Sequence, residues 1–332
     1  MSSPIRPDFA PLTNDEIDAS RRFELLPWLR LMRLPNVFTA VADVAMGYLF
    51  VHKSVRSPSQ LACLIAASAL LYTAGMVLND VFDIEVDRKE RPFRPLPSRK
   101  VGLGAARLFG FVLLALGLAA GWLAGFLPGA SAALPWRSGV MATLLALSVT
   151  AYDGFIKFTP VGPLGMGTCR FLNVLMGMST ATYTAHAVLF GYGPAELLAA
   201  GGIGLYIVGV TWFARNEAET SRSWPLVAAM TVMATGAIAL GASAAYLPAV
   251  AMDRTMYWIL LLLLMLTVLR RCGIAAVDPA PVNVQAGVKH SILSLIWLDA
   301  AATAATSGPW HGLAVAALLL PALILGRWVY ST

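Results

Sequence analysis

Ten long apolar runs divide the sequence, and short polar or Gly/Pro-containing breaks separate them. A helix needs about 20 apolar residues to cross the hydrocarbon core of a bilayer, with a usual range of about 17–25. The runs lie near residues 36–52, 60–79, 103–127, 138–156, 163–187, 197–214, 225–248, 255–270, 287–305 and 310–329. The pattern predicts ten membrane-spanning helices, or nine if one of the last two runs lies along the membrane or only part-way through it.

The composition supports this prediction. Of the 332 residues, 58% are hydrophobic and 13% are charged, whereas soluble globular proteins carry roughly 25% charged residues. So few charges could not cover a soluble protein of this size, which excludes a disordered chain, a secreted disulfide scaffold and an ordinary cytosolic enzyme. The runs are also too long and continuous for barrel strands. The predicted fold class is therefore an all-α integral membrane protein, a multi-span helical bundle.

Lysine and arginine residues fall mainly on one side of the predicted spans. With the N-terminus inside, the inside segments hold 19 of them and the outside loops hold 4, leaving aside Arg170 within the fifth span. This bias places both termini in the cytoplasm. Residues 1–25 then form a polar cytoplasmic tail and residues 26–332 one transmembrane domain. We expect a multi-pass protein of a bacterial inner (cell) membrane, and no nucleic-acid partner, because topology explains the net charge of +6.

A compact group of acidic residues follows the second span. Asp80, Asp83 and Asp87 are spaced i, i+3 and i+7, so a helix would align them on one face. Asn79 lies one position away, at the membrane end. Aligned carboxylates repel one another unless a cation lies among them. An oxygen-only set suits Mg²⁺, which takes one or two carboxylates and completes its shell with water and substrate phosphate.

The basic run after these acids includes Arg91 and Arg94, which could each hold a phosphate with two hydrogen bonds. The alternative interpretation is a solvated loop whose acids and bases neutralise one another. The spacing of the carboxylates and their place at the end of a membrane helix favour a metal–diphosphate site.

The pattern NDxxDxxxD followed by RPLPS, over residues 79–98, resembles the first aspartate-rich motif of the UbiA superfamily of intramembrane prenyltransferases. The resemblance implies a bundle around a central lipid-accessible cavity, a Mg²⁺-bound prenyl diphosphate at the cytoplasmic side, and transfer of the prenyl group to an acceptor. By position, metal binding would fall to Asn79, Asp80, Asp83 and Asp87. Arg94 matches the arginine of the RPLPS tail, and Arg99 replaces the Gly that usually follows it.

Two further segments resemble the family less closely. Asn36, which opens the first span after Arg33, could hydrogen-bond the diphosphate or a metal-bound water, or simply start the helix. Tyr152 and Lys157 follow the fourth span and resemble a Tyr…Lys element of the family, with Lys157 a candidate diphosphate ligand. The alternative for Lys157 is a lysine that snorkels to the membrane surface.

The second aspartate motif of the family has no clear counterpart here. Its expected position, residues 214–222, contains no aspartate. Asn216 and Glu217 could hold a second Mg²⁺ loosely. Alternatively the second metal is absent, and Arg215 and Arg222 neutralise the phosphate. This departure suggests a divergent branch of the family.

Several polar residues lie within the predicted spans, where they are costly unless they face a cavity or each other. Arg170 is close enough to the cytoplasmic side to reach a diphosphate, and Asn173 lies one turn further along. Asp43 is deeper and could orient an acceptor or accept a proton. For Asp43, Arg170 and Asp299 the alternative is an interhelical hydrogen bond or ion pair.

The sequence therefore predicts Mg²⁺-assisted transfer of a prenyl group from a prenyl diphosphate to an aromatic or other lipophilic acceptor within the membrane. The partners would be the donor, the acceptor and membrane lipids. The predicted catalytic residues are Asp80, Asp83, Asp87 and Lys157. The predicted substrate-binding residues are Asn36, Asn79, Arg91, Arg94, Tyr152, Arg170, Asn173, Arg215 and Arg222. The alternative function is a catalytically inactive lipid-binding or transport-assisting membrane protein with the same fold.

Overall fold

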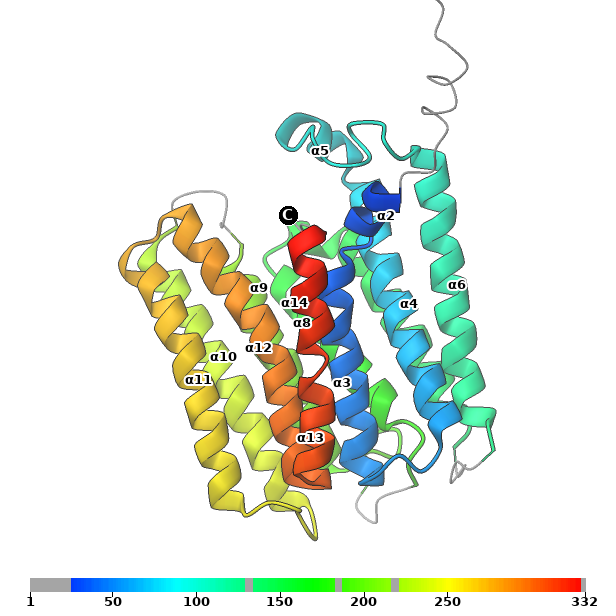
Figure 1. Ribbon diagram of the computed structural model, residues 1–332, viewed down its shortest axis with the longest axis vertical. Coiled ribbons are helices and arrows are strands. Elements are labelled where there is room, and N and C mark those ends of the chain that lie inside the picture. The colour runs from blue at the N-terminus through cyan, green and yellow to red at the C-terminus, as the bar shows by residue number, and fades with distance from the viewer. Residues whose placement is uncertain (1–24, 129–133, 183–186, 216–220, 330–332) are drawn as a thin grey trace, which may run out of the picture.

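The computed structural model describes residues 25–128, 134–182, 187–215 and 221–329, and the regular elements within these ranges are helical (Figure 1). They are α2 (Leu25–Leu31), α3 (Leu34–His52), α4 (Pro58–Phe82), α5 (Ile84–Glu90), α6 (Leu103–Phe126), α7 (Arg137–Gly154), η1 (Ile156–Phe158), α8 (Gly162–Met178), α9 (Pro194–Phe213), α10 (Ser223–Ser243), η2 (Ala244–Tyr246), α11 (Arg254–Val277), α12 (Pro281–Ser307), α13 (Pro309–Ala316) and α14 (Leu319–Trp328). Proline opens α3, α4, α8, α9, α12 and α13, because its fixed φ suits the first helical turn and its missing N–H has no partner to lose there.

Seven stretches of the described chain are long and apolar enough to cross a membrane. They are α3, α4, α6, α9, α10 with η2, α11, and the stretch Pro309–Arg327. The other three predicted runs correspond to α7, α8 and α12, which pack against the same helices. The predicted fold class, a multi-span all-α bundle, is confirmed.

The last apolar run, expected near residues 310–329, forms two short helices. α13 ends at Ala316 and α14 begins at Leu319, and the two lie end to end beside α12 and α3 (Figure 1). Pro321 explains the break, because its ring would clash with the carbonyl four residues earlier and it has no N–H to donate. Both of the last two runs therefore pack in the bundle, and the broken run Pro309–Arg327 is one of the seven stretches able to cross a membrane. The fifth run is shorter than expected, because α8 ends at Met178 rather than near residue 187.

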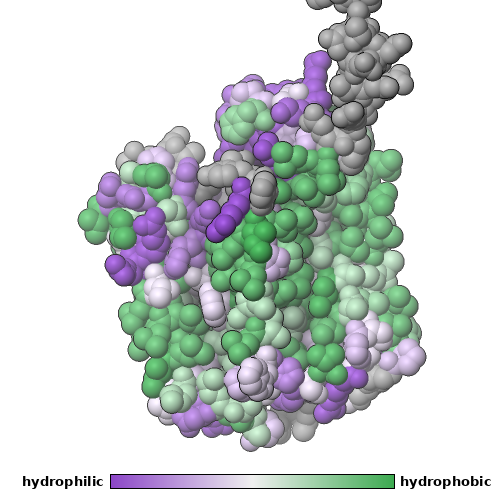
Figure 2. Space-filling view, in the orientation of Figure 1, coloured by the Kyte–Doolittle hydropathy of each residue, from purple (hydrophilic) through white to green (hydrophobic). Residues whose placement is uncertain are grey.

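The surface has an apolar band between two polar ends (Figure 2). α2, α5 and the C-terminal end of α14 lie at the same end of the bundle, which we call the α5 end (Figure 1). A green apolar band between two hydrophilic ends is the distribution that a bilayer requires. The charged motif therefore lies at one polar end of the membrane-crossing part.

Glycine residues allow α3 and α8 to cross closely. A Cβ atom at Gly47 of α3 would lie 2.5 Å from the Val174 carbonyl of α8, and one at Gly177 of α8 would lie 2.5 Å from the Val44 carbonyl of α3. In lipid, where apolar burial drives helix association weakly, such close backbone packing holds helices together. This crossing positions the buried polar residues of α3 and α8 opposite one another.

Candidate functional site

The acidic motif spans a break between two helices, where the sequence predicts one continuous helix. α4 ends at Phe82, Asp83 has φ −85° and ψ 5°, and α5 begins at Ile84. The backbone hydrogen bonds Asp83 N–Asn79 O (2.9 Å) and Asp87 N–Asp83 O (2.8 Å) nevertheless keep helical spacing through the break. Asp80 and Asp87 are both buried, at 5% and 4% exposure. Helical spacing thus continues through the break, and Asp83 meets a different cation from the one that Asp80 and Asp87 share.

Arg94 joins the first and last carboxylates of the motif. Its Nη1 donates to both oxygens of Asp87, at 3.0 and 2.9 Å, and lies 3.5 Å from Oδ1 of Asp80. All three side chains are about 5% exposed. The structure therefore brings Arg94 together with two of the predicted metal-binding residues, on the side facing α2.

Arg33 is a site residue that the sequence analysis did not select. Its Nη2 donates to Oδ1 of Asp80 at 3.1 Å. Arg33 has φ 45° and ψ 45° and is the N-cap of α3, a left-handed conformation that is uncommon outside glycine and often occurs at functional positions. Its place three residues before Asn36 in the RLPN segment was the available signal.

Lys157 contacts the other half of the motif. Its Nζ donates to Oδ1 of Asn79 at 2.8 Å and lies 2.6 Å from Oδ1 of Asp83. Lys157 belongs to η1, directly after α7. Three cationic side chains from separate segments of the chain, Arg33, Arg94 and Lys157, therefore contact the side-chain oxygens of the motif.

A basic cavity of about 220 Å³ opens beside this cluster at the α5 end. Its charged lining consists of Arg30, Arg33, Arg94, Lys100 and Asp80. Four cations against one carboxylate favour a polyvalent anion such as a diphosphate.

The donor set fits Mg²⁺ bound together with a phosphate. Its members carry only oxygen ligands, and Asp80 and Asp87 contact the same Arg94 nitrogen, so their carboxylates converge. Within the described residues no three His, Cys, Asp or Glu side chains converge on one point. Mg²⁺ needs only one or two carboxylates when water and substrate phosphate fill the remaining positions. These residues therefore suit a Mg²⁺ ion whose coordination shell is completed by water and phosphate.

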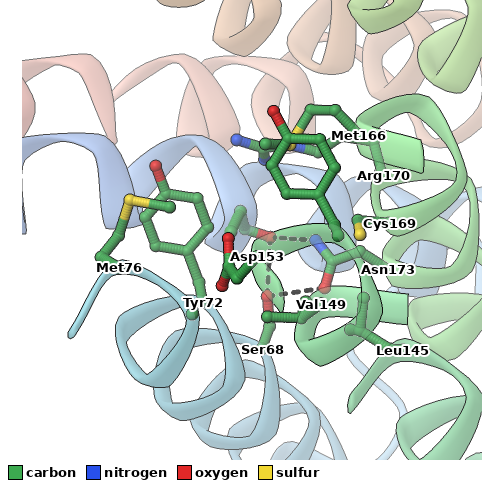
Figure 3. Close-up of a pocket in the computed structure, with 13 residues that line it drawn as sticks. Ser68, Tyr72, Met76, Leu145, Val149, Asp153, Met166, Cys169, Arg170 and Asn173 are labelled. Carbon is green, nitrogen blue, oxygen red and sulfur yellow. Dashed lines mark hydrogen bonds between the residues drawn. The ribbon is translucent and has the colours of Figure 1, made fainter. Parts of the chain in front are cut away.

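A second cavity lies deeper, among α3, α4, α7 and α8 (Figure 3). Met76, Leu145, Val149 and Met166 form apolar parts of its wall, and Tyr72 lies beside Met76 on α4 (Figure 3). Ser68 and Asn173 line its polar side, where Ser68 Oγ donates to Asn173 Oδ1 at 2.8 Å. Asn173 Nδ2 in turn donates to the Ala40 carbonyl at 2.9 Å. Hydrogen bonds within the protein thus satisfy this polar side.

Arg170 forms a buried ion pair and makes no contact with the acidic motif. Its Nη1 donates to Oδ2 of Asp43 at 2.8 Å, and its Nη2 donates to Oγ1 of Thr39 at 2.8 Å. The guanidinium also lies over the Tyr72 ring, 5.3 Å from its centroid. Asp299 of α12 is fully buried, and neither of its carboxyl oxygens has a hydrogen-bond partner in the described part of the chain. The structure therefore shows the interhelical ion pair for Asp43 and Arg170.

Asn36 and Arg91 lie near the cluster without a side-chain hydrogen bond to it. Asn36 is half-buried in the first turn of α3, and Arg91 caps the end of α5. Tyr152 lines the deep cavity.

The region of the altered second motif is only partly described. Arg215 donates to the carbonyls of Thr159 and Pro160, at 3.2 and 3.4 Å, and so supports the turn after Lys157. Arg222 is exposed before α10. Asn216 and Glu217 lie outside the described residues.

Asp153 is a buried carboxylate that sequence reasoning missed. It is 3% exposed, lines the deep cavity, and its Oδ2 has no hydrogen-bond partner in the described part of the chain. Its position between Tyr152 and Lys157, at the end of a membrane helix, was the only signal in the sequence.

Known proteins resemble the chain in sequence and in fold. The UbiA prenyltransferase family matches residues 40–280. A digeranylgeranylglyceryl phosphate synthase of Metallosphaera sedula is 30% identical over 152 residues, which are 46% of this chain and 50% of that protein. The enzyme of the same name from Sulfolobus acidocaldarius is 38% identical over 101 residues, 30% of this chain and 36% of that protein. The matches thus span half or less of these relatives.

Solved structures share the fold at low sequence identity. A UbiA homolog from Archaeoglobus fulgidus bound to GPP and Mg²⁺ has a TM-score of 0.56 and 15% identity, covering 88% of this chain and 99% of that one. The apo structure of a UbiA homolog from Aeropyrum pernix has a TM-score of 0.56 and 18% identity, covering 88% and 98%. Together with the match over residues 40–280, this fold shows that the chain belongs to the UbiA prenyltransferase family.

Proposed function

We propose that the protein transfers a prenyl group from a prenyl diphosphate to an aromatic or other lipophilic acceptor within the membrane, and that the reaction depends on Mg²⁺. The supporting observation is that Arg33, Arg94 and Lys157 contact the carboxylate oxygens of the acidic motif. Such a cluster combines ligands for a divalent cation with donors for phosphate oxygens. The adjoining basic cavity adds Arg30 and Lys100 as further cationic side chains for binding phosphate.

In our proposal the side chains of the cluster have two roles, metal binding and phosphate binding. In our proposal, Asn79, Asp80, Asp83 and Asp87 hold the metal. When bound, Mg²⁺ neutralises negative charge that develops on the departing diphosphate. Arg33, Arg94 and Lys157 hydrogen-bond the phosphate oxygens, and their fixed positions favour the separated charges of the transition state.

The remaining predicted contacts stay proposals. Asn36 and Arg91 would bind the diphosphate from the rim of the cluster, and Arg215 and Arg222 would add positive charge. Asn216 and Glu217 would hold a second Mg²⁺. Tyr152, Arg170 and Asn173 would line the space for the prenyl group and the acceptor.

We also propose that the α5 end faces the cytoplasm of a bacterial cell. The supporting observation is the excess of lysine and arginine in the loops at that end. In this arrangement residues 1–25 form a cytoplasmic tail and residues 26–332 the catalytic domain. The water-soluble diphosphate would then enter and leave on the cytoplasmic side.

The decisive experiment follows diphosphate release from geranylgeranyl diphosphate by the purified protein. We chose this donor because the relatives are named for geranylgeranyl-containing products. Release should require Mg²⁺, and Asp80→Ala or Asp83→Ala should abolish it. Glu85→Gln is the matched control, because Glu85 lies in the same motif but is exposed and pairs only with Arg88. Equal release by all four proteins would reject the proposal.

A catalytically inactive lipid-binding or transport-assisting protein is the second candidate. The observation that favours it is the absence of aspartate from residues 214–222. Such a protein would bind geranylgeranyl diphosphate in the presence of Mg²⁺ but leave it intact with a broad panel of acceptors. A lack of both Mg²⁺ and diphosphate affinity would reject both candidates.

A further inference from the structure

Asp153 differs from the three carboxylates of the acidic motif because it forms no ion pair with a cationic side chain in the part of the chain that the structure describes. Asp80, Asp83 and Asp87 each contact Arg33, Arg94 or Lys157. Asp153 is 3% exposed, and within the described residues its Oδ2 accepts no hydrogen bond. A buried carboxylate oxygen without a partner costs about 1–3 kcal/mol or more. Asp43 and Asp299 also have buried oxygens without a partner, and among these three carboxylates only Asp153 lines the deep cavity, where a ligand would supply a hydrogen bond.

Asp153 lines the deep cavity. Figure 3 shows the Asp153 carboxyl among Tyr72, Val149 and Asn173, which line the same cavity. A Cβ atom at Gly75 of α4 would lie 2.7 Å from Cγ1 of Val149 and 3.7 Å from Oδ2 of Asp153. A larger residue at position 75 would therefore crowd Val149 and the carboxylate.

Asp153 also lies next to the proposed diphosphate site. It precedes Lys157 by four residues, and Lys157 contacts Asn79 and Asp83. Gly75 lies one turn of α4 before Asn79. The carboxylate therefore sits between the charged cluster and the apolar cavity, where the prenyl carbon that loses diphosphate would meet its acceptor.

The cavity suits the reactive end of an acceptor. Its volume is about 50 Å³, and a water molecule needs roughly 10–15 Å³ on this scale. A few non-hydrogen atoms, such as a hydroxyl group and its carbon, fit in this space. An ionised carboxylate only accepts hydrogen bonds, so its natural partner is an O–H donor.

We propose that Asp153 is a catalytic base that binds the hydroxyl group of an alcohol or phenol acceptor and takes up its proton. This inference rests on the proposed function and assigns the acceptor a chemical class. Asp43 also has an unpartnered oxygen, Oδ1, but it does not line this cavity, and its Oδ2 is bound by the Arg170 guanidinium and by Asn173.

The step balances without a further reactant. The bond between the prenyl carbon and the diphosphate oxygen breaks, and the diphosphate leaves with the electron pair. A lone pair of the acceptor oxygen forms the new carbon–oxygen bond. The hydroxyl proton moves to Oδ2 of Asp153, from which it later returns to solvent.

The test uses Asp153→Asn, which keeps the shape of the side chain but removes its basicity. The donor is geranylgeranyl diphosphate, and the hydroxyl probes are geranylgeranylglyceryl phosphate and methanol, a small alcohol that fits the cavity. Ether formation should fall about 10²–10⁴-fold, the usual contribution of a general base. Mg²⁺-dependent donor binding should remain within about twofold, and Asp153→Glu should restore part of the rate. Asp278→Asn, an exposed change between α11 and α12, is the matched control.

Other outcomes reject the inference in distinguishable ways. Unchanged ether formation by Asp153→Asn would show that Asp153 is not the base. Loss of donor binding together with transfer would place Asp153 at the diphosphate instead. A wild-type protein that releases diphosphate but prenylates neither probe would contradict the hydroxyl acceptor. If the wild-type protein releases no diphosphate, the proposed function itself fails and the inference with it.

Discussion

Arg94 holds two carboxylates whose mutual repulsion would otherwise open the acidic motif. It contacts Asp80 and Asp87 from a position only 6% exposed. Buried charges of this kind depend on their partners, because an uncompensated buried charge is far more costly than a compensated one. At the residue scale, the motif is therefore built as much by its cations as by its aspartates.

We expect Arg94→Ala to weaken both stability and donor binding. Loss of one partner of a buried ion pair costs about 3–5 kcal/mol, so thermal unfolding in detergent should occur at a clearly lower temperature. Affinity for geranylgeranyl diphosphate should fall at least about tenfold, because charge-assisted bonds to phosphate are lost. Arg94→Lys should recover part of the stability but little of the two-bond contact with Asp87. Wild-type affinity in Arg94→Ala would contradict this role.

At the scale of elements, the sequence predicts the helices well and their interruptions poorly. Runs of apolar residues locate the membrane-crossing helices, because nothing else satisfies the backbone in lipid. The break at Asp83 depends on packing, and the break before α14 depends on Pro321. A hydropathy pattern averages over many residues and therefore shows neither break. The pairings of Lys157 with Asn79 and of Asp43 with Arg170 join residues 78 and 127 positions apart. Only the crossing of the helices brings such residues together.

The α3–α8 crossing provides the element-scale prediction. Gly177→Val should destabilise the protein by about 1–3 kcal/mol, because its Cβ atom would lie 2.5 Å from the Val44 carbonyl and the helices would have to separate. The shift should also weaken the hydrogen bonds between Arg170 and Asp43.

Gly201→Ala of α9 is the matched control. No atom lies within 4 Å of a Cβ atom at Gly201, and alanine favours a helix by up to about 1 kcal/mol over glycine. Thermal unfolding of the two variants measures the difference. Equal unfolding temperatures would show that close packing at Gly177 does not hold α3 and α8 together.

At the scale of the whole molecule, the polar ends and the apolar band define how the bundle sits in a membrane (Figure 2). The α5 end carries the acidic motif and the basic cavity, and the excess of lysine and arginine in its loops supports our proposal that this end faces the cytoplasm. The orientation of the bundle decides which compartment supplies the prenyl diphosphate. Measuring this orientation therefore tests the proposal without measuring the reaction.

Thiol labelling in intact cells checks the orientation. A cysteine introduced as Ser98→Cys, exposed at the α5 end, should resist a membrane-impermeant maleimide until the cells are opened. Ser54→Cys, exposed in the loop between α3 and α4, should react in intact cells. The wild-type protein reports the background from its own cysteines, two of which are buried. The reverse labelling pattern would invert the topology.

The central claim is that the acidic motif and its cations release diphosphate from a prenyl donor with the help of Mg²⁺. The most direct measurement is the rate of diphosphate release from geranylgeranyl diphosphate by the wild-type protein and by Asp83→Ala, each with Mg²⁺ and with a chelator. We predict steady release only by the wild-type protein with Mg²⁺. Release that persists in the chelator or in Asp83→Ala, or no release under any of these conditions, would contradict the claim.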